Sequence, residues 1–425
     1  MFLGRYYVDL AVLSLVLLVV VVALGYIRNL NVGILAIIAS FALVLVGGLD
    51  MALVLNGFPS KLFLNLLGIM YLFGLLQANG TLGLLSKKLV MLVGDRAWLT
   101  PIVVYVISYV VSAVGPGAIA AQAIMIPFSV LLSVQMGIKP YMMSSMAILG
   151  TVGGTTSPVA MTGIIVQGVI DEYAMSFPGV EHVVSSMMLG VSIMNAICAA
   201  VIYVLFRGWR LRQAPVASKD KEPFNRDQVM SLVGMAALIV CVLAFGMDVG
   251  LMGFTVAIAL SLLGAVNVEG ALARVPWGVL LLVGGMSILM DITFEVGGIR
   301  LLTKALESVM NGSTASGVMA LASGITGWFS SGNGVVIPTF VPTAPALASS
   351  LGCSAVSIIV GIAAGATVGG LSPFDSGGSM IIGYYSQEVE ITEKEQQKMF
   401  LVFFGLAALC VFVAAVCGLF GLYSL

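Results

Sequence analysis

Long apolar segments separated by short polar stretches follow one another along the whole chain. A helix needs about 20 apolar residues to cross the hydrocarbon core of a bilayer. Segments near this length or longer lie at 8–27, 31–50, 62–79, 98–135, 140–172, 184–206, 229–246, 250–267, 277–294, 315–350, 354–386 and 399–421. The apolar residues are continuous within each segment and do not alternate as in the strands of a β-barrel. The pattern therefore predicts an all-α polytopic membrane protein.

Two of the long segments contain a break that no charged residue flanks. The stretch 98–135 is interrupted by Gly-Pro-Gly at 115–117, and the stretch 315–350 by Ser-Ser-Gly-Asn-Gly at 330–334. Non-helical backbone inside a membrane is tolerated only against protein or a water-filled cavity. We therefore predict two re-entrant hairpins whose tips stop inside the membrane. Two ordinary spans joined by a tight turn are the alternative in each case.

The two halves of the chain resemble each other at an offset of about 217 residues. Asn-Val-Gly-Ile-Leu at 31–35 pairs with Asp-Val-Gly-Leu-Met at 248–252, and Thr-Val-Gly-Gly at 151–154 recurs at 367–370. Each half contains five predicted spans and one hairpin, and an odd number of spans inserts the second half upside down. Such inverted repeats are typical of secondary transporters, which bind their substrate near the midplane between the repeats.

These features divide the chain into a first repeat at 1–206, with its hairpin at about 98–135, and a second repeat at 229–425, with its hairpin at about 315–350. The polar linker 207–228 holds six basic and three acidic residues, and basic loops stay on the cytoplasmic side of a membrane. We therefore expect a cytoplasmic linker, both termini outside, and a location in the cell inner (plasma) membrane.

Composition and the distribution of charge exclude several classes of function. Charged residues make up 9% of the chain and hydrophobic residues 60%, whereas a soluble domain averages about 25% charged residues. The chain lacks the basic excess of a nucleic-acid binder. The single histidine, His182, falls in a polar loop, and Asp291 lies near the wrong interface for an aspartyl intramembrane protease. We expect no enzyme, no cofactor and no nucleic-acid partner.

Four breaks rich in Gly, Pro, Ser and Thr fall at membrane depth and form two pairs in the repeat. They lie at 115–117 and 153–158 in the first half, and at 331–334 and 369–378 in the second. Each break ends one half-helix, whose free carbonyls suit a small cation, and begins another, whose N–H groups and positive dipole end suit an anion. Ordinary Pro and Gly kinks are the alternative interpretation. The predicted substrate-binding residues are Gly115, Pro116, Gly117, Thr155, Thr156, Ser157, Ser331, Gly332, Asn333, Gly334, Ser372, Pro373 and Ser376.

Asp375 is the one acidic residue at the centre of a break. An ionisable side chain inside a membrane is a functional candidate by default. Asp375 could bind Na+ together with Asn333 or carry a coupling proton, or it could cap the helix that follows. Gln122, beyond the first tip, could reach the same site or make an interhelical hydrogen bond. Because the breaks contain no Arg or Lys, we expect dipoles, hydroxyl groups and bound Na+ or H+ to hold an anionic substrate.

Several motifs resemble the N-terminal signature of the MatC-type dicarboxylate carriers. They include Gly-Phe-Pro-Ser at 57–60, Ser-Ala-Val-Gly-Pro-Gly-Ala at 112–118 and Thr-Thr-Ser-Pro-Val-Ala-Met-Thr-Gly at 155–163. The plan is also similar to that of the wider ion-transporter superfamily, which includes the divalent anion:sodium symporters. Its members carry Ser-Asn-Thr at each hairpin tip, which helps to bind a carboxylate and sodium ions; here Asn333 alone matches. The resemblance implies a malonate or C4-dicarboxylate substrate, a homodimer and an elevator-type movement.

The sequence thus predicts a secondary active transporter that couples the movement of a small dicarboxylate to Na+ or H+ across the lipid bilayer. A Na+/H+ antiporter or an oxyanion exporter on the same scaffold is the alternative. A channel is less favoured, because inverted repeats with two pairs of broken helices are typical of alternating access.

Overall fold

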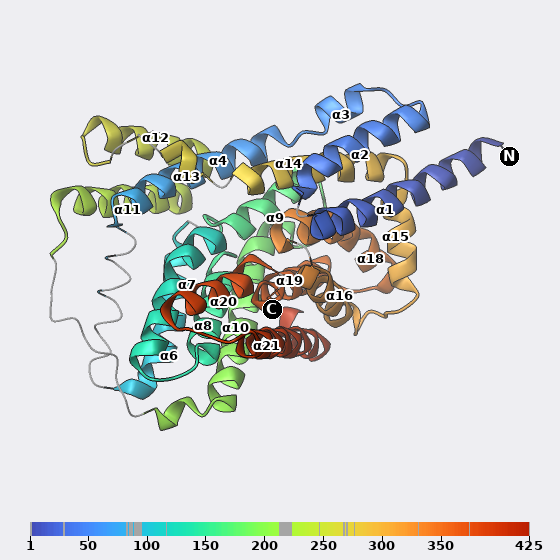
Figure 1. Cartoon of the computed structure of the whole chain (residues 1–425). Coiled ribbons are helices and arrows are strands. Elements are labelled where there is room, and N and C mark those ends of the chain that lie inside the picture. Colours follow the sequence, from blue (N-terminus) through green and yellow to red (C-terminus); the bar gives the residue numbers. More distant parts are fainter. Residues whose placement is uncertain are drawn as a thin grey trace.

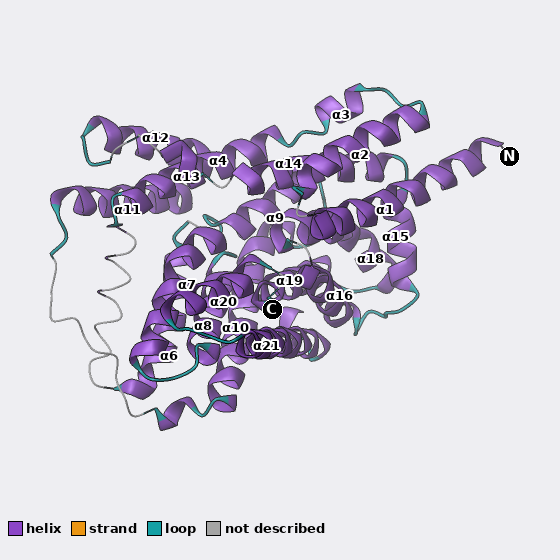
Figure 2. Cartoon of the chain, in the orientation of Figure 1, coloured by secondary structure: helices purple, strands orange, loops and turns teal. Residues whose placement is uncertain are grey.

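The computed structural model describes residues 2–28, 30–81, 84, 88, 96–115, 117–211, 223–245, 247–266, 268, 271–275, 277–329, 331–373 and 375–424. Every regular element among these residues is a helix, and Figure 2 shows no strand in this part of the chain. The predicted all-α fold class is therefore confirmed. Part of the expected linker, 212–222, lies outside the described residues.

Most of the helices lie within the apolar segments of the sequence; α3, α13 and α15 lie between them. In the first half they are α1 (Phe2–Arg28), α2 (Val32–Gly47), α3 (Ala52–Asn56), α4 (Ser60–Ala78), α6 (Thr100–Ala113), α7 (Gly117–Gln135), α8 (Tyr141–Gly154), α9 (Met161–Glu172) and α10 (Val183–Leu205). In the second half they are α11 (Arg226–Phe245), α12 (Val249–Leu262), α13 (Ala271–Arg274), α14 (Trp277–Glu295), α15 (Gly298–Glu307), α16 (Ala315–Phe329), α17 (Ile337–Phe340), α18 (Ala344–Leu351), α19 (Ala355–Val368), α20 (Ser376–Glu388) and α21 (Glu393–Leu419).

The helices form two layers, each built from both halves of the chain (Figure 1). The upper layer consists of α1–α4 and α11–α14, and the lower layer of α6–α10 and α16–α21. In the upper layer α2 packs against α14 and α4 against α12; in the lower layer α6 packs against α8 and α16 against α19. Because α8 and α19 are buried along nearly their whole length, they form the centre of the lower layer. Helix α15 contacts α1 of the upper layer and α18 of the lower.

Glycines let the helices of the upper layer approach closely at two places. A Cβ on Gly68 of α4 would overlap the carbonyl oxygen of Gly250 in α12, and a Cβ on Gly285 of α14 would overlap that of Gly33 in α2. Small residues allow such backbone contact between membrane helices. Gly33 and Gly250 are equivalent in the repeat, as are Gly68 and Gly285. The same contact is therefore made twice: α4 of the first half meets α12 of the second, and α14 of the second half meets α2 of the first.

Matched caps begin two of these helices. The Asn31 side chain accepts a hydrogen bond from the Gly33 N–H at 2.9 Å, and the Asp248 carboxylate accepts one from the Leu251 N–H at 3.0 Å. A cap of this kind satisfies a donor that the first turn of a helix leaves without an internal partner. The repeated motifs that begin with Asn31 and Asp248 are therefore the starts of α2 and α12.

The stretch after the second tip is divided into several short pieces. A π-helical turn at Gly332–Val336 leads into α17, a 3-10 turn at Val341–Thr343 and then α18. Proline has no N–H and cannot continue a regular helical hydrogen-bond pattern. Prolines fall in three successive pieces, at Pro338, Pro342 and Pro345. Helix α7, which follows the first tip, runs without interruption for 19 residues around Pro127.

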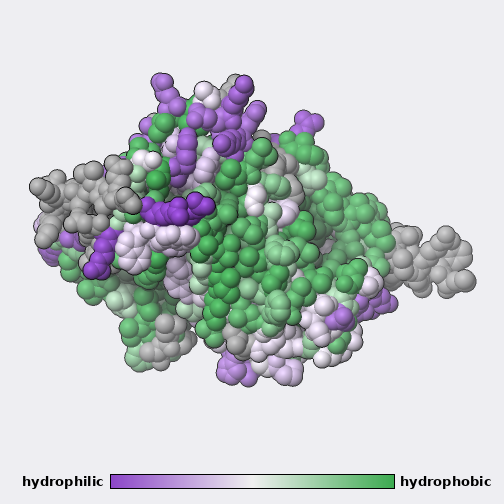
Figure 3. All heavy atoms as spheres, turned by 90° about the horizontal axis from the view of Figure 1, so that it is seen from below, coloured by the Kyte–Doolittle hydropathy of each residue, from purple (hydrophilic) through white to green (hydrophobic). Residues whose placement is uncertain are grey.

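Apolar side chains cover much of the molecular surface. On the face that Figure 3 shows, hydrophobic residues dominate and hydrophilic ones gather toward the upper and lower edges. Among the described residues, four helical stretches are long and apolar enough to cross a membrane: Gly117–Gln135, Val180–Leu205, Gly332–Leu351 and Lys394–Leu419. Further apolar helices are shorter. These features are those of an integral membrane protein.

Candidate functional site

Residues from both halves meet at a small cavity of about 60 Å³ in the lower layer. Its wall includes the start of α7, the loop between α8 and α9, the second tip, and the end of α19 with the loop that follows. A buried water needs at least about 10–15 Å³, so the cavity has room for roughly four water molecules. The polar residues that line it are Gln122, Thr155, Thr162, Ser331, Asn333, Thr367 and Asp375. The lining therefore offers neutral hydrogen-bonding groups and one carboxylate.

The structure places only some of the predicted site residues at this cavity. The lining contains Thr155, Ser331, Gly332 and Asn333, together with Asp375. The predicted residues outside the described lining are Gly115, Gly117, Thr156, Ser157, Gly334, Ser372 and Pro373. Pro116 lies outside the described residues, and Ser376 begins α20 without a described side chain.

The first tip is shaped by glycine conformations and by close packing. Gly115 and Gly117 have φ angles of 142° and 73°, which side-chain-bearing residues rarely adopt. A Cβ on Gly115 would collide with the Phe73 ring of α4, and a Cβ on Gly117 would lie 2.7 Å from the Cβ of Met161 in α9. The first tip is thus enclosed by α4 and α9, and its described glycines do not line the cavity.

Ser157 and Ser372 occupy equivalent positions and make equivalent hydrogen bonds. The Ser157 hydroxyl donates to the carbonyl oxygen of Ala113, the last residue of α6. The Ser372 hydroxyl donates at 3.2 Å to the carbonyl oxygen of Trp328, close to the end of α16. Both bonds satisfy a carbonyl at a helix end. These hydroxyls therefore connect the loops after α8 and α19 to the first arms of the two predicted hairpins.

Thr162 joins the first-half loop to the second tip. Its N–H and that of Gly163 donate to the carbonyl oxygen of Thr155 at 3.0 and 3.3 Å. Its hydroxyl donates at 2.9 Å to Oδ1 of Asn333, and Nδ2 of Asn333 lies 3.3 Å from the sulfur of Met161. Sequence reasoning missed Thr162 because it belongs to the regular first turns of α9; the one available signal was its place in the motif after Pro158.

Gln122 and Asp375 approach the cavity from two other helices. Gln122 lines the cavity and its Nε2 also donates to the Thr151 hydroxyl at 3.2 Å, so both roles considered for it from the sequence are present. Asp375 stands immediately before α20, yet its side chain makes no capping hydrogen bond with that helix. A Cβ on Gly370 would lie 3.2 Å from Oδ2 of Asp375, which places the carboxylate over the loop that ends α19.

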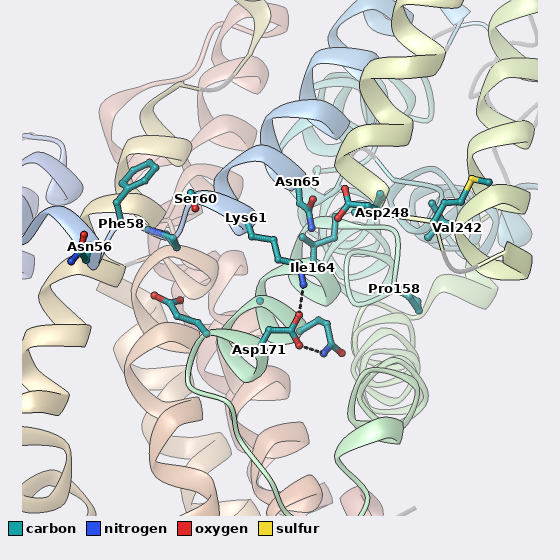
Figure 4. A pocket seen from close by; sticks show the side chains of 16 residues that line it. Asn56, Phe58, Ser60, Lys61, Asn65, Pro158, Ile164, Asp171, Val242 and Asp248 are labelled. Atoms are coloured by element: carbon teal, nitrogen blue, oxygen red, sulfur yellow. Dashed lines mark hydrogen bonds and ion pairs between the residues drawn. The ribbon is translucent and has the colours of Figure 1, made fainter. Parts of the chain in front are cut away.

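A larger cavity of about 500 Å³ separates the two layers near Pro158 of the same loop (Figure 4). Lys61 of α4 reaches across it, and its Nζ lies 2.8 Å from Oδ2 of Asp171 in α9. Gln167 donates a second hydrogen bond to Asp171 at 2.8 Å. Asn65, four residues beyond Lys61 in α4, lies beside Asp248 at the start of α12. An ion pair thus joins the upper layer to the lower at the mouth of this cavity.

Two comparisons with known proteins bear on this arrangement. Residues 8–155, about a third of the chain, match the family model described as the dicarboxylate carrier protein MatC N-terminus. The fold is similar to that of the YdaH transporter of Alcanivorax borkumensis, with a TM-score of 0.55 and 12% sequence identity over 86% of this chain and 87% of that one. No protein of curated function matches the sequence. The family match points to a transporter and not to an enzyme, as the composition had indicated. The similarity to the solved structure shows the likeness of the fold.

Proposed function

We propose that this protein is a secondary active transporter of small dicarboxylates, with malonate or a C4-dicarboxylate as substrate. The observation that carries the proposal is the meeting of broken-helix residues from both halves at one polar cavity. Helix breaks at membrane depth are where secondary transporters hold substrates and coupling ions. The match of residues 8–155 to the N-terminus of a dicarboxylate carrier supports the choice of substrate.

The proposal includes two inverted repeats, each with a re-entrant hairpin. Contacts that recur at equivalent positions support this part of it. The glycine contact between α2 and α14 corresponds to that between α12 and α4. The hydrogen bond from Ser157 to Ala113 corresponds to that from Ser372 to Trp328. Exchange of partners between halves is what a pseudo-two-fold axis in the membrane plane would produce.

The proposed movement is of the elevator type, with the lower layer moving against the upper. Support comes from the cavity, because all the elements that line it belong to the lower layer. A moving layer could therefore carry a bound anion without taking its site apart. The proposed homodimer, the outward termini and the location in the inner membrane rest on the family resemblance and on the charge distribution.

The proposed coupling ion is Na+ or H+, with Asp375 as the residue that responds to it. An ionised carboxylate at the cavity would repel an arriving dianion, and a bound cation or proton would remove this repulsion. Among the described residues, no group of three or more His, Cys, Asp and Glu side chains could hold a metal ion. A sodium ion here would therefore depend on carbonyl and hydroxyl oxygens beside one carboxylate.

Purified protein in proteoliposomes tests the proposed function. Uptake of labelled malonate and succinate is measured with Na+ and pH gradients imposed separately, and counterflow exchange is measured in the same vesicles. We expect accumulation of at least one dicarboxylate with one of the two gradients. Absence of both uptake and counterflow for both substrates, in vesicles that contain folded protein, would contradict the proposed substrate class.

A further inference from the structure

The carboxamide of Asn333 is held by two different groups at its two ends. The hydroxyl of Thr162 has two acceptors within reach, the Asn333 oxygen at 2.9 Å and the Thr155 hydroxyl at 3.2 Å, and its one proton goes to the nearer. The Asn333 nitrogen lies 3.3 Å from the sulfur of Met161. A thioether has no hydrogen to donate and is only a weak acceptor. The nitrogen end of the amide must therefore face Met161, which leaves the oxygen end facing the hydroxyl.

This orientation matters for an anion, because a carboxylate needs hydrogen-bond donors and is repelled by a carbonyl oxygen. The oxygen of the Asn333 amide already accepts a hydrogen bond from Thr162. The NH2 group is therefore the part of the amide that can leave its present contact and donate to a substrate. The contact with the Met161 sulfur is weak and is easily replaced by a charge-assisted hydrogen bond to a carboxylate. Both Thr162 and Asn333 line the cavity.

We infer that Thr162 is a positioning residue for the proposed substrate: it holds the Asn333 amide so that its nitrogen serves the anion. This inference rests on the proposed function and deepens it. It assigns Asn333 to the dicarboxylate and leaves the coupling cation to other ligands. It also makes the site depend on a contact between the halves, since Thr162 belongs to α9 and Asn333 to the second tip.

Two variants and a control separate this role from simple packing. Thr162→Val keeps the shape and removes the hydroxyl, whereas Thr162→Ser keeps the hydroxyl. Thr293→Val in α14 is the matched control, because the Thr293 hydroxyl is also buried but donates to the carbonyl oxygen of Leu289 in its own helix. Thermal unfolding of each purified variant verifies the fold, and Thr162→Ala replaces Thr162→Val if the latter does not fold.

We expect Thr162→Val to raise the KM for the dicarboxylate about fivefold, the effect of losing one net hydrogen bond. The maximal rate and the dependence on Na+ or pH should stay as in the wild type. Thr162→Ser and Thr293→Val should retain the wild-type KM. Isothermal titration with malonate or succinate should show the same order of affinities, and adding Thr162→Val to Asn333→Ala should weaken binding no further.

Three results would overturn the inference while leaving the proposed function intact. The first is an unchanged KM in Thr162→Val beside active wild-type protein. The second is that Thr162→Val lowers the affinity for the dicarboxylate equally in the wild-type protein and in Asn333→Ala, because Thr162 would then act independently of the amide. The third is a shifted cation dependence in Thr162→Val, which would assign Asn333 to the cation. A wild-type protein that neither binds nor transports any dicarboxylate would instead contradict the proposed function.

Discussion

The two tips occupy equivalent places in the repeat but contribute different groups. The first consists of glycines at positive φ that pack against α4 and α9, and its described residues add no side chain to the cavity. In the second, the Ser331 hydroxyl accepts a hydrogen bond from the Gly334 N–H at 3.1 Å, and Asn333 faces the cavity. The comparison teaches that equivalent positions of the two halves can serve different ends: the described residues of the first tip pack against neighbouring helices, whereas the second tip lines the cavity.

The helical stretches that follow the two tips also differ, in how regular they are. Helix α7 is continuous, whereas the stretch from Gly332 to Leu351 changes between π-helical, α-helical and 3-10 turns. Such π-helical turns are frequent at functional sites. Because it is interrupted, the second stretch depends more on contacts with neighbouring elements, such as the hydrogen bond between Asn333 and Thr162.

The packing that the halves share should give the largest effects when it is broken. We expect Gly68→Ala and Gly285→Ala each to destabilise the protein by about 1–3 kcal/mol, since the new Cβ overlaps a carbonyl oxygen of the facing helix. Gly405→Ala in α21 is the control, because a Cβ there meets nothing within 4 Å. Thermal unfolding in detergent measures all three. A loss in only one of the first two variants would contradict the equivalence of the contacts.

A variant of Asp375 tests whether the second half alone supplies the charged group, because Ala160 stands at the equivalent position before α9. Asp375→Asn keeps the size of the side chain and removes its charge. Gradient-driven uptake should fall about tenfold or more while counterflow exchange persists, as expected for an intramembrane acid that couples the two fluxes. Asp227→Asn, in the first turn of α11, is the control. Normal accumulation by Asp375→Asn would exclude the coupling role.

Ser157 and Ser372 provide a symmetric pair with a moderate expected effect. The sequence predicted that these hydroxyls bind substrate, whereas their observed hydrogen bonds go to helix ends. Ser157→Ala and Ser372→Ala should therefore each cost about 1 kcal/mol of folding stability and leave the KM nearly unchanged. Parallel measurements of unfolding and uptake decide between the two interpretations. A raised KM at unchanged stability would instead support the predicted role in binding.

The smallest effects concern two exposed ion pairs. The Lys61 and Asp171 side chains are 70% and 39% exposed and join the two layers, whereas Lys139 and Glu395 are 51% and 45% exposed within the lower layer. Pairs so exposed contribute at most about 1 kcal/mol. If the layers move against each other, Lys61→Gln should change the uptake rate about twofold and Lys139→Gln should not.

Reversal of both charges tests whether the Lys61 effect comes from the pair. Lys61→Asp combined with Asp171→Lys should restore the wild-type uptake rate, and added salt should reduce the difference between variants because exposed charges are screened. Equal effects at both ion pairs would contradict a role specific to the boundary between the layers.

The sequence by itself determined most of the helices and the breaks between them. Continuous apolar segments require helices in a bilayer, and Gly and Pro interrupt them through local backbone geometry. The same local signals identified Thr155, Ser331, Asn333 and Asp375, which all line the cavity. Pro338, Pro342 and Pro345 are a local signal for the interruptions after the second tip, which the predicted hairpin at 315–350 did not include.

Only the tertiary structure decided which of the candidate groups meet. Thr162 lies inside a regular helix, and Lys61 and Asp171 are separated by 110 residues, so no local pattern marked either contact. Serine is a residue type that often binds ligands, but the hydroxyls of Ser157 and Ser372 donate to carbonyl oxygens at the ends of α6 and α16. A hydroxyl can serve a substrate or a neighbouring carbonyl, and which of these it serves depends on how the helices pack.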